Sequence, residues 1–309
     1  MSQPPARPDM RVTLGRLALE NPVMVASGTF GWAHEYQGLV RLDALGAVVT
    51  KGVSLAPRLG NPQPRIAETP AGMLNSIGLQ NPGLEAFVAE KMPFLRGLRT
   101  AVVVNILGDT VEEYARLAAA LDGVDGVDAL EVNISCPNVR AGGIAFGSDA
   151  GAAAEVAAAV RAATRLPVLV KLSPNVTDLV AIASRVAAAG VDGLVLINTL
   201  RGMAIDVWTG RPRLGNAIGG LSGPAIRPVA VRAVFEVSRA VEVPVVGCGG
   251  ITGWADAAEH VRAGATAVQV GSATFRDPAA ALGVLEGLER FLGELGLGSC
   301  RELVGTVQV

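Results

Sequence analysis

Residues 167–199 read PVLVKLSPNVTDLVAIASRVAAAGVDGLVLINT and show the unit from which the chain is built. Two short apolar runs, 167–174 and 193–199, enclose an Ala-rich segment, 178–189, whose composition favours a helix. Neither apolar run alternates with polar residues, and such continuous runs are typical of parallel strands that are buried on both faces. The stretch therefore predicts a strand, a helix and a second, parallel strand.

The same pattern recurs along the chain, with apolar runs that end in Gly, Ser, Asn or Lys. The predicted strands are 22–28, 47–52, 101–106, 128–136, 167–174, 193–199, 244–250 and 267–273, and the helical segments are 111–121, 151–164, 178–189, 226–240, 254–263 and 278–292. Strands that alternate with helices in this number predict an α/β fold, a closed (β/α)8 TIM barrel, as a single domain over residues 1–309. A doubly wound open sheet is the alternative, and the lack of a dinucleotide-binding fingerprint favours the barrel.

Two connections are longer than ordinary loops between a strand and a helix. Residues 53–100 follow the second predicted strand, and residues 200–225 follow the sixth. Long connections inside a compact domain are usually functional or act as lids. Both leave the carboxyl ends of strands, where TIM barrels place their active sites, so we expect both to contribute to a site.

Composition excludes several classes of function. The formal net charge is −2 over 309 residues, so no basic field is present to bind nucleic acid or an anionic membrane. No apolar run reaches the roughly 18 residues of a spanning helix, and the polar, Pro-rich start has no signal-peptide core. We expect a cytoplasmic protein with no nucleic-acid or membrane partner.

Cysteine and histidine are too sparse to predict a metal site. The three cysteines, Cys136, Cys248 and Cys300, show no metal-ligand spacing, and an odd, small number suits a reducing compartment. With only His34 and His260 present, a Ser-His-Asp triad or a histidine-ligated metal is disfavoured.

Polar residues terminate or closely follow six of the predicted strands. They are Ser27, Lys51, Asn105, Asn133, Lys171 and Asn198. In a barrel these strand ends converge on one mouth. A capping role explains one such residue, but a functional site explains six from different strands better.

The last two predicted strands end in Gly249-Gly250 and Gly271-Ser272, each before a helical segment. Glycine lets backbone N–H groups approach an anion closely, and helix N-termini favour negative charge. These turns predict a phosphate site, although tight turns also need glycine and many unrelated barrels share the pattern.

Two segments contain candidate groups for chemistry. In NISCPN (133–138), Cys136 lies between two amides, Asn133 and Asn138, and a cysteine can act as a general base when its pKa approaches the working pH. Taken alone, Cys136 is better explained as a buried structural thiol, which is how we interpret Cys248 and Cys300. The loop NSIGLQNPG (75–83) offers amides and backbone N–H groups to a planar, anionic ligand, although it also has the composition of an ordinary turn.

In combination, these motifs resemble the dihydroorotate dehydrogenase family. The resemblance covers roughly residues 12 to 295 in the expected order. The matching pieces are ASGTFG (26–31), TKGVS (50–54), NSIGLQNPG (75–83), NISCPN (133–138), VKLSPN (170–175), INTLRGMAID (197–206), GGLSGPAI (219–226), GCGGI (247–251) and QVGSATF (269–275).

The resemblance implies an FMN-containing barrel that oxidises (S)-dihydroorotate to orotate in pyrimidine biosynthesis. It implies that Cys136 removes the proton from carbon 5 and that hydride passes from carbon 6 to the flavin. The substrate residues it implies are Lys51, Asn75, Ser76, Ile77, Gly78, Leu79, Asn133, Asn198 and Thr199. The FMN residues it implies are Ser27, Lys51, Gly52, Asn105, Asn133, Lys171, Ile197, Gly223, Gly249, Gly250, Gly271 and Ser272, with Lys171 near the pyrimidine edge of the flavin.

The stretch CPNVRAGGIAFG (136–147) is most similar to class 1B members of the family. That class implies a homodimeric core within a heterotetramer, whose partner iron–sulfur flavoprotein subunit carries FAD and [2Fe-2S] and passes electrons to NAD⁺. A class 1A-like, fumarate-dependent enzyme is the nearest alternative. A flavin-dependent reductase of uracil-like rings or tRNA uridines, and a non-catalytic barrel that binds a phosphate ligand, also stay open.

Overall fold

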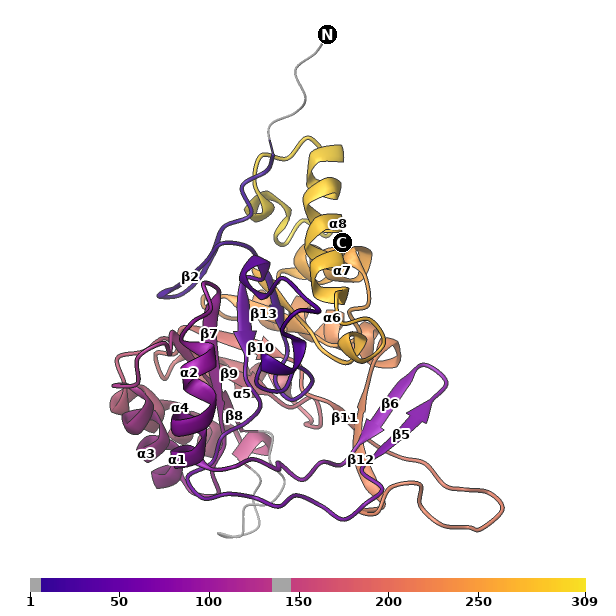
Figure 1. Cartoon of the computed structure of the whole chain (residues 1–309). Helices are drawn as coiled ribbons and strands as arrows, with labels where there is room; N and C mark the ends of the chain where they lie inside the picture. The colour runs from indigo at the N-terminus through magenta and orange to yellow at the C-terminus, as the bar shows by residue number, and fades with distance from the viewer. Residues whose placement is uncertain (1–6, 135–145) are drawn as a thin grey trace.

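A closed barrel of parallel strands forms the centre of the protein. The computed structural model describes residues 7–134 and 146–309 (Figure 1). The barrel order is β10-β13-β14-β3-β4-β7-β8-β9, which confirms the predicted TIM barrel and excludes the open sheet. The strands are β3 (Val23–Val25), β4 (Ala47–Val49), β7 (Ala101–Ile106), β8 (Ala129–Asn133), β9 (Val168–Leu172), β10 (Gly193–Leu196), β13 (Val245–Cys248) and β14 (Ala267–Val270).

Six long helices pack around the barrel, close to the predicted positions. They are α3 (Val111–Leu121), α4 (Ala150–Ala163), α5 (Leu179–Ala187), α6 (Arg227–Ser238), α7 (Trp254–Ala263) and α8 (Ala280–Glu294). Three of them begin at a side chain that accepts a backbone N–H three residues later, namely Thr110, Asp149 and Asp178. Such N-caps satisfy otherwise unpaired donors and fix where each helix starts. Between β3 and β4 the chain forms two 3₁₀ turns, η1 (His34–Tyr36) and η2 (Leu42–Ala44).

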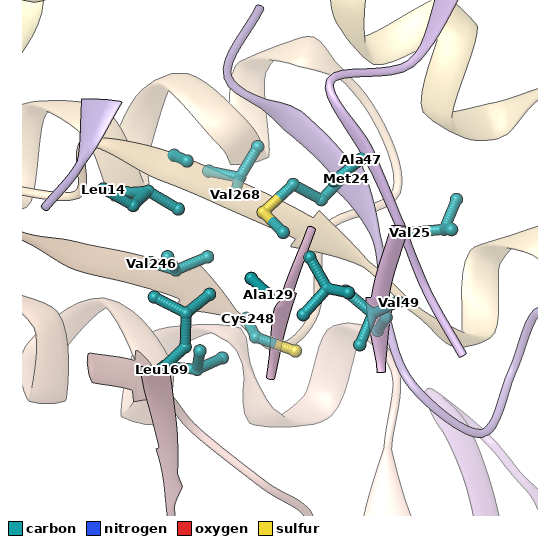
Figure 2. Close-up of a cluster of buried hydrophobic side chains, with 14 of the residues drawn as sticks. Leu14, Met24, Val25, Ala47, Val49, Ala129, Leu169, Val246, Cys248 and Val268 are labelled. Carbon is teal, nitrogen blue, oxygen red and sulfur yellow. The ribbon is translucent and has the colours of Figure 1, made fainter. Parts of the chain in front are cut away.

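The barrel strands are buried on both faces, as their unbroken apolar sequences predict. Figure 2 shows Met24, Val49, Leu169, Val246 and Val268 from different strands in one apolar cluster. Leu14 also enters this cluster, from an N-terminal hairpin of β1 (Val12–Leu14) and β2 (Leu17–Leu19) that the sequence did not predict.

The two long connections contain a second sheet, which lies beside the barrel in Figure 1. Its strands are β5 (Ile66–Thr69), β6 (Gly72–Asn75), β11 (Leu200–Met203) and β12 (Ile218–Ser222), in the antiparallel order β11-β12-β6-β5. The first connection also contains α1 (Leu84–Ala86), a π-helical turn η3 (Phe87–Lys91) and α2 (Met92–Leu95). The central pairing joins Leu74 to Leu221, so local patterns could not predict this sheet.

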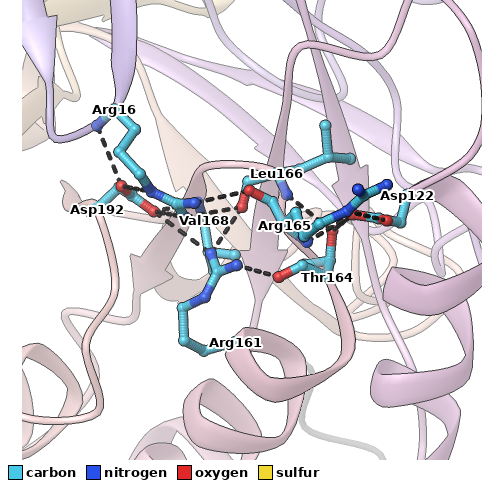
Figure 3. A network of polar contacts seen from close by, with 8 residues as sticks. All are labelled: Arg16, Asp122, Arg161, Thr164, Arg165, Leu166, Val168 and Asp192. Carbon is cyan, nitrogen blue, oxygen red and sulfur yellow. Dashed lines mark hydrogen bonds and ion pairs between the residues drawn. The ribbon is translucent and has the colours of Figure 1, made fainter.

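An ion-pair network fastens the N-terminal hairpin to the amino-terminal ends of β9 and β10 (Figure 3). The buried Asp192 carboxylate accepts two hydrogen bonds from the Arg16 guanidinium, both at 2.8 Å, and one from the Val168 N–H, also at 2.8 Å. Arg161 lies 3.5 Å from the same carboxylate. Asp192 therefore links the hairpin, a barrel strand and α4.

We predict that Asp192→Ala lowers the free energy of unfolding by about 2–4 kcal/mol, because it leaves buried donors unpaired. Burial alone would raise the pKa of Asp192, but hydrogen bonds from Arg16 and Val168 hold that pKa below 3.8. Since the folded pKa is depressed, the stabilisation is present at neutral pH and is lost as the pH falls below about 4.

Urea denaturation at pH 7 and at about pH 3, below the ordinary pKa of aspartate, measures this effect. Asp125→Ala is the matched control, because that carboxylate is 84% exposed beside Arg96 and should contribute less than about 1 kcal/mol. Equal midpoints for the two variants would show that the network does not stabilise the barrel.

Candidate active site

The C-terminal ends of the barrel strands form one ring, here called the mouth, because all eight strands are parallel. Most of the predicted site residues lie on it. Ser27 follows β3; Lys51 and Gly52 follow β4; Asn105, Asn133 and Lys171 lie in β7, β8 and β9; Ile197, Asn198 and Thr199 follow β10; Gly249 and Gly250 follow β13; and Gly271 and Ser272 follow β14. Gly223 lies between β12 and α6.

Two amides from neighbouring parts of the mouth contact each other. The Asn198 Nδ2 atom donates to Asn133 Oδ1 at 3.4 Å, and Asn198 Oδ1 accepts from the Thr199 N–H at 2.8 Å. The Tyr114 hydroxyl donates to the Asn133 backbone oxygen at 2.7 Å and steadies the end of β8. This geometry fits a ligand with both donors and acceptors on its ring.

The second sheet places Asn75 close to Thr199, because both residues lie next to Gly220. Asn75 pairs with Gly220, and its Nδ2 atom donates to the Gly220 oxygen at 3.3 Å. A Cβ atom on Gly220 would lie 2.1 Å from Thr199 Oγ1, so only glycine permits this approach. The two long connections therefore deliver the two predicted substrate residues side by side.

The turn after β6 is held by Asn61, a residue that the sequence did not single out. Asn61 Nδ2 donates to the buried Ser76 hydroxyl at 2.8 Å, and the Asn61 N–H donates to the Ile77 oxygen at 3.0 Å. Gly78 and Leu79 both have positive φ, 73° and 58°. Asn61 thus keeps these four predicted residues in one tight turn beside Asn75.

Beneath the mouth, four buried polar side chains form a connected network. Lys171 Nζ donates to Gln269 Oε1 at 3.1 Å, and Gln269 Nε2 donates to Glu131 Oε2 at 2.6 Å. Glu131 Oε1 also accepts from Asn105 Nδ2 at 2.7 Å. Sequence reasoning missed Glu131 and Gln269. The sequence signal that could have identified Glu131 is its position inside the apolar run 129–133. A carboxylate in a buried strand needs polar or charged partners elsewhere in the fold.

The two lysines of the mouth differ in their electrostatics. Burial and the nearby Arg65 charge lower the pKa of the half-buried Lys51 ammonium. Burial would also lower the pKa of Lys171, but Cys248 and the Glu131 carboxylate raise it above 10.5. Lys171 therefore stays protonated at neutral pH. Burial raises the pKa of the Cys248 thiol, and the nearby Lys171 charge partly opposes that shift.

The turn after β13 has the geometry of an anion cradle. Gly249 and Gly250 have φ values of 134° and 74°, and a Cβ atom on Gly250 would lie 2.4 Å from Arg227 Cβ. The Asp256 carboxylate accepts from the Thr252 N–H at 2.8 Å and pairs with Arg227. His260 Nε2 lies 3.1 Å from the Gly249 oxygen. These contacts hold the backbone of the turn from the side of α6 and α7.

An unsatisfied acceptor points to a ligand in the mouth. Within the part of the chain that the structure describes, the buried Asn105 Oδ1 atom has no hydrogen-bond partner. Buried polar atoms are nearly always paired, so a bound ring with an N–H donor fits this position. The glycine cradle at the other side of the mouth fits a phosphate. FMN carries both groups, and the residues present therefore fit it.

Some predictions fall outside these observations. Cys136 and its neighbours Ser135, Pro137 and Asn138 lie outside the described residues, so the role of Cys136 stays a prediction. The other cysteines are buried, and Cys300 Sγ lies 3.3 Å from the Met10 oxygen, in agreement with structural roles.

Over residues 7–134 and 146–309, no group of three His, Cys, Asp or Glu side chains is placed to hold a metal, and no helix is long and apolar enough to cross a membrane.

Fold and mouth together define a (β/α)8 barrel whose mouth has the geometry to fit a phosphorylated ligand above a buried, charged network. Comparison with known proteins narrows the class. The family model described as dihydroorotate dehydrogenase matches residues 9–292, and the chain belongs to that family.

Curated relatives extend along the whole chain. The chain is 58% identical over 302 residues to "Dihydroorotate dehydrogenase B (NAD(+)), catalytic subunit" of Pelobacter propionicus, covering 98% of this chain and 99% of that protein. It is 55% identical over 303 residues to the identically named protein of Geobacter sulfurreducens, and 55% over 301 residues to that of Desulforamulus reducens, covering 98% and 97% of this chain and 99% of each relative. These matches confirm the resemblance seen in the motifs.

We predict that Gly250→Ala destabilises the cradle, because its φ of 74° and the 2.4 Å approach to Arg227 exclude a side chain. The strain should cost about 1–3 kcal/mol in unfolding free energy and weaken retention of a phosphorylated cofactor. Gly253→Ala is the control, since Gly253 is extended with φ −154° and has open space. Thermal melting with and without added FMN measures both effects, and equal behaviour of the two variants would refute the cradle.

Proposed function

We propose that this chain oxidises (S)-dihydroorotate to orotate in pyrimidine biosynthesis, as the catalytic subunit of an NAD⁺-linked dihydroorotate dehydrogenase. The observation that carries the proposal is the match over 98% of the chain, at 58% identity, to a relative whose name states that activity. The barrel mouth supports it, because its amides, cations and glycine cradle suit a flavin and a polar ring substrate.

One FMN, bound in a single domain of residues 1–309, would supply the hydride acceptor. In this proposal Asn105, Lys171 and Ile197 hold the ring. Lys171, as a buried cation at its pyrimidine edge, favours negative charge there. The remaining contacts come from Ser27, Lys51, Gly52, Asn133 and Gly223, and the backbone N–H groups of Gly249, Gly250, Gly271 and Ser272 hold the phosphate.

The substrate would lie between the barrel and the second sheet. Asn133 and Asn198 offer donors and acceptors to the dihydroorotate ring, while Asn75 and Thr199 close its other side. The turn of Ser76, Ile77, Gly78 and Leu79 offers backbone N–H groups, and Lys51 supplies positive charge for the carboxylate.

Cys136 would be the base that takes the proton from carbon 5 of dihydroorotate. A free cysteine has a pKa near 8.5, so only a small fraction is thiolate at neutral pH. The positive charge of Lys51, or neighbouring hydroxyl groups, would favour the thiolate. Proton removal by Cys136 and hydride transfer from carbon 6 together create the double bond of orotate.

The partner of this subunit would be an iron–sulfur flavoprotein that carries FAD and [2Fe-2S] and passes electrons to NAD⁺. The names of the relatives support this assignment, since each is called the catalytic subunit of an NAD⁺ enzyme. We propose a homodimer of this chain at the core of a heterotetramer, acting in the cytoplasm.

We predict that Cys136→Ala keeps bound FMN but slows flavin reduction by dihydroorotate at least about 100-fold, the contribution typical of a general base. In the wild type, the rate should rise with pH until the thiol ionises. Stopped-flow absorbance of the flavin between pH 6 and pH 9 measures both. Near-wild-type reduction by the variant, or a flat profile with chemistry rate-limiting, would reject Cys136 as the base.

We also predict that the isolated chain reduces neither NAD⁺ nor fumarate at a useful rate, and that co-expression with the iron–sulfur flavoprotein subunit restores NAD⁺ reduction. Turnover with each acceptor, measured as orotate formed, tests this. Rapid fumarate reduction by the chain alone would instead assign a class 1A-like enzyme.

A further inference from the structure

A carboxylate lies at the centre of the barrel, among side chains assigned to FMN. Glu131 is 0% exposed and comes from β8, two residues before Asn133. It accepts hydrogen bonds from Asn105 on β7 and from Gln269 on β14. A buried carboxylate is unfavourable unless it is paired and hydrogen-bonded, and an apolar side chain would fill the same space at lower cost. Its position therefore calls for a role beyond packing.

Glu131 determines which way the Asn105 amide faces. An ionised carboxylate only accepts hydrogen bonds, so Asn105 must present its Nδ2 atom, which lies 2.7 Å from Glu131 Oε1. The Oδ1 atom is then turned away. A Cβ atom on Gly52 would lie 2.9 Å from this oxygen, so Oδ1 faces the segment that follows β4 at the mouth. Its missing partner within the described residues makes it a ready acceptor for a ligand N–H.

Glu131 also orients Gln269 and, through it, the contact to Lys171. Gln269 presents Nε2 to Glu131 at 2.6 Å, and its Oε1 atom is therefore the end that accepts from Lys171 Nζ at 3.1 Å. The ammonium lies 4.0 Å from Glu131 Oε1 and is held by a neutral amide between the two charges. The Glu131 carboxylate on β8 thus orients two amides and holds one cation, which come from three other strands, β7, β14 and β9.

We propose that Glu131 is a positioning residue for FMN, acting on Asn105 directly and on Lys171 through Gln269. This inference rests on the proposed function, because the ring N–H and the electron-accepting ring belong to FMN. Glu131 aims the Asn105 oxygen at the mouth and partly offsets the Lys171 charge, so it sets both the affinity for FMN and the reduction potential of the bound flavin.

The test begins with Glu131→Gln, which keeps the volume but removes the charge. A glutamine here can accept from one of the two amides and must turn its own NH₂ toward the other, so Asn105 loses its fixed orientation. We expect the dissociation constant of FMN to rise about tenfold, the equivalent of one hydrogen bond between neutral groups. The midpoint potential should become more positive, because the Lys171 charge is no longer offset. Flavin fluorescence on titration of apoprotein and equilibration with reference dyes measure the two quantities.

A double-mutant cycle separates positioning from a general structural effect. In an Asn105→Ala background, Glu131→Gln should change FMN affinity less than about twofold, since the group through which it acts is gone. The shift of potential should persist, because it passes through Lys171. Glu155→Gln, on the exposed face of α4, is the matched control and should change neither quantity.

Gln269→Met provides a second route if Glu131→Gln does not fold. It removes the hydrogen bond that holds the Lys171 ammonium in place, while Glu131 keeps its charge and its hydrogen bond to Asn105. The ammonium can then shift relative to the flavin, so the midpoint potential should change while FMN affinity stays within about threefold. Wild-type affinity and potential in Glu131→Gln, or an unchanged potential in Gln269→Met, would overturn the positioning role alone. A wild-type chain that binds no FMN would overturn the proposed function and this inference together.

Discussion

Closure of the parallel sheet is the constraint on which the rest of the structure depends. The hydrogen bonds that join β14 to β3 complete the ring of strands, and they bring residues from both ends of the chain to one mouth. Lys51 and Ser272 can act on one ligand only because of this closure. The N-terminal hairpin, fastened by Asp192, covers the opposite end of the barrel and leaves the mouth as the face where chemistry takes place.

The interior of the barrel changes character along its axis. Apolar side chains such as Leu14 and Met24 pack at the end near the hairpin (Figure 2), while Glu131, Gln269 and Lys171 form the polar layer nearer the mouth. Breaking a buried ion pair by removing one member typically costs about 3–5 kcal/mol, so this layer is sensitive to single changes. A redox cofactor benefits from such surroundings, because fixed charges and dipoles tune its electron affinity without having to reorganise.

Much of this architecture is predictable from sequence, and the reasons are local. The unbroken apolar runs at 167–174 and 193–199 predict buried parallel strands, and the helix over 111–121 begins at the Thr110 cap. The position of the mouth is also predictable, because TIM barrels place their active sites at the C-terminal ends of the strands. The antiparallel sheet is not predictable from sequence, because Leu74 pairs with the distant Leu221 and neither segment alternates clearly between polar and apolar residues. Glu131 and Gln269 were missed because their partners come from distant strands, and Asn61 because a turn gives no periodic signal. The role of Cys136, which is predicted from the family motif, lies outside the described residues.

A flavin bound in this mouth should be reduced by dihydroorotate. Anaerobic mixing of the purified holoprotein with L-dihydroorotate, followed through the visible absorbance of the flavin, tests it most directly. We expect a yellow protein that bleaches rapidly and forms one orotate per flavin. A colourless protein that cannot be reconstituted with FMN, or a yellow one that does not bleach either alone or with its partner subunit, would contradict it.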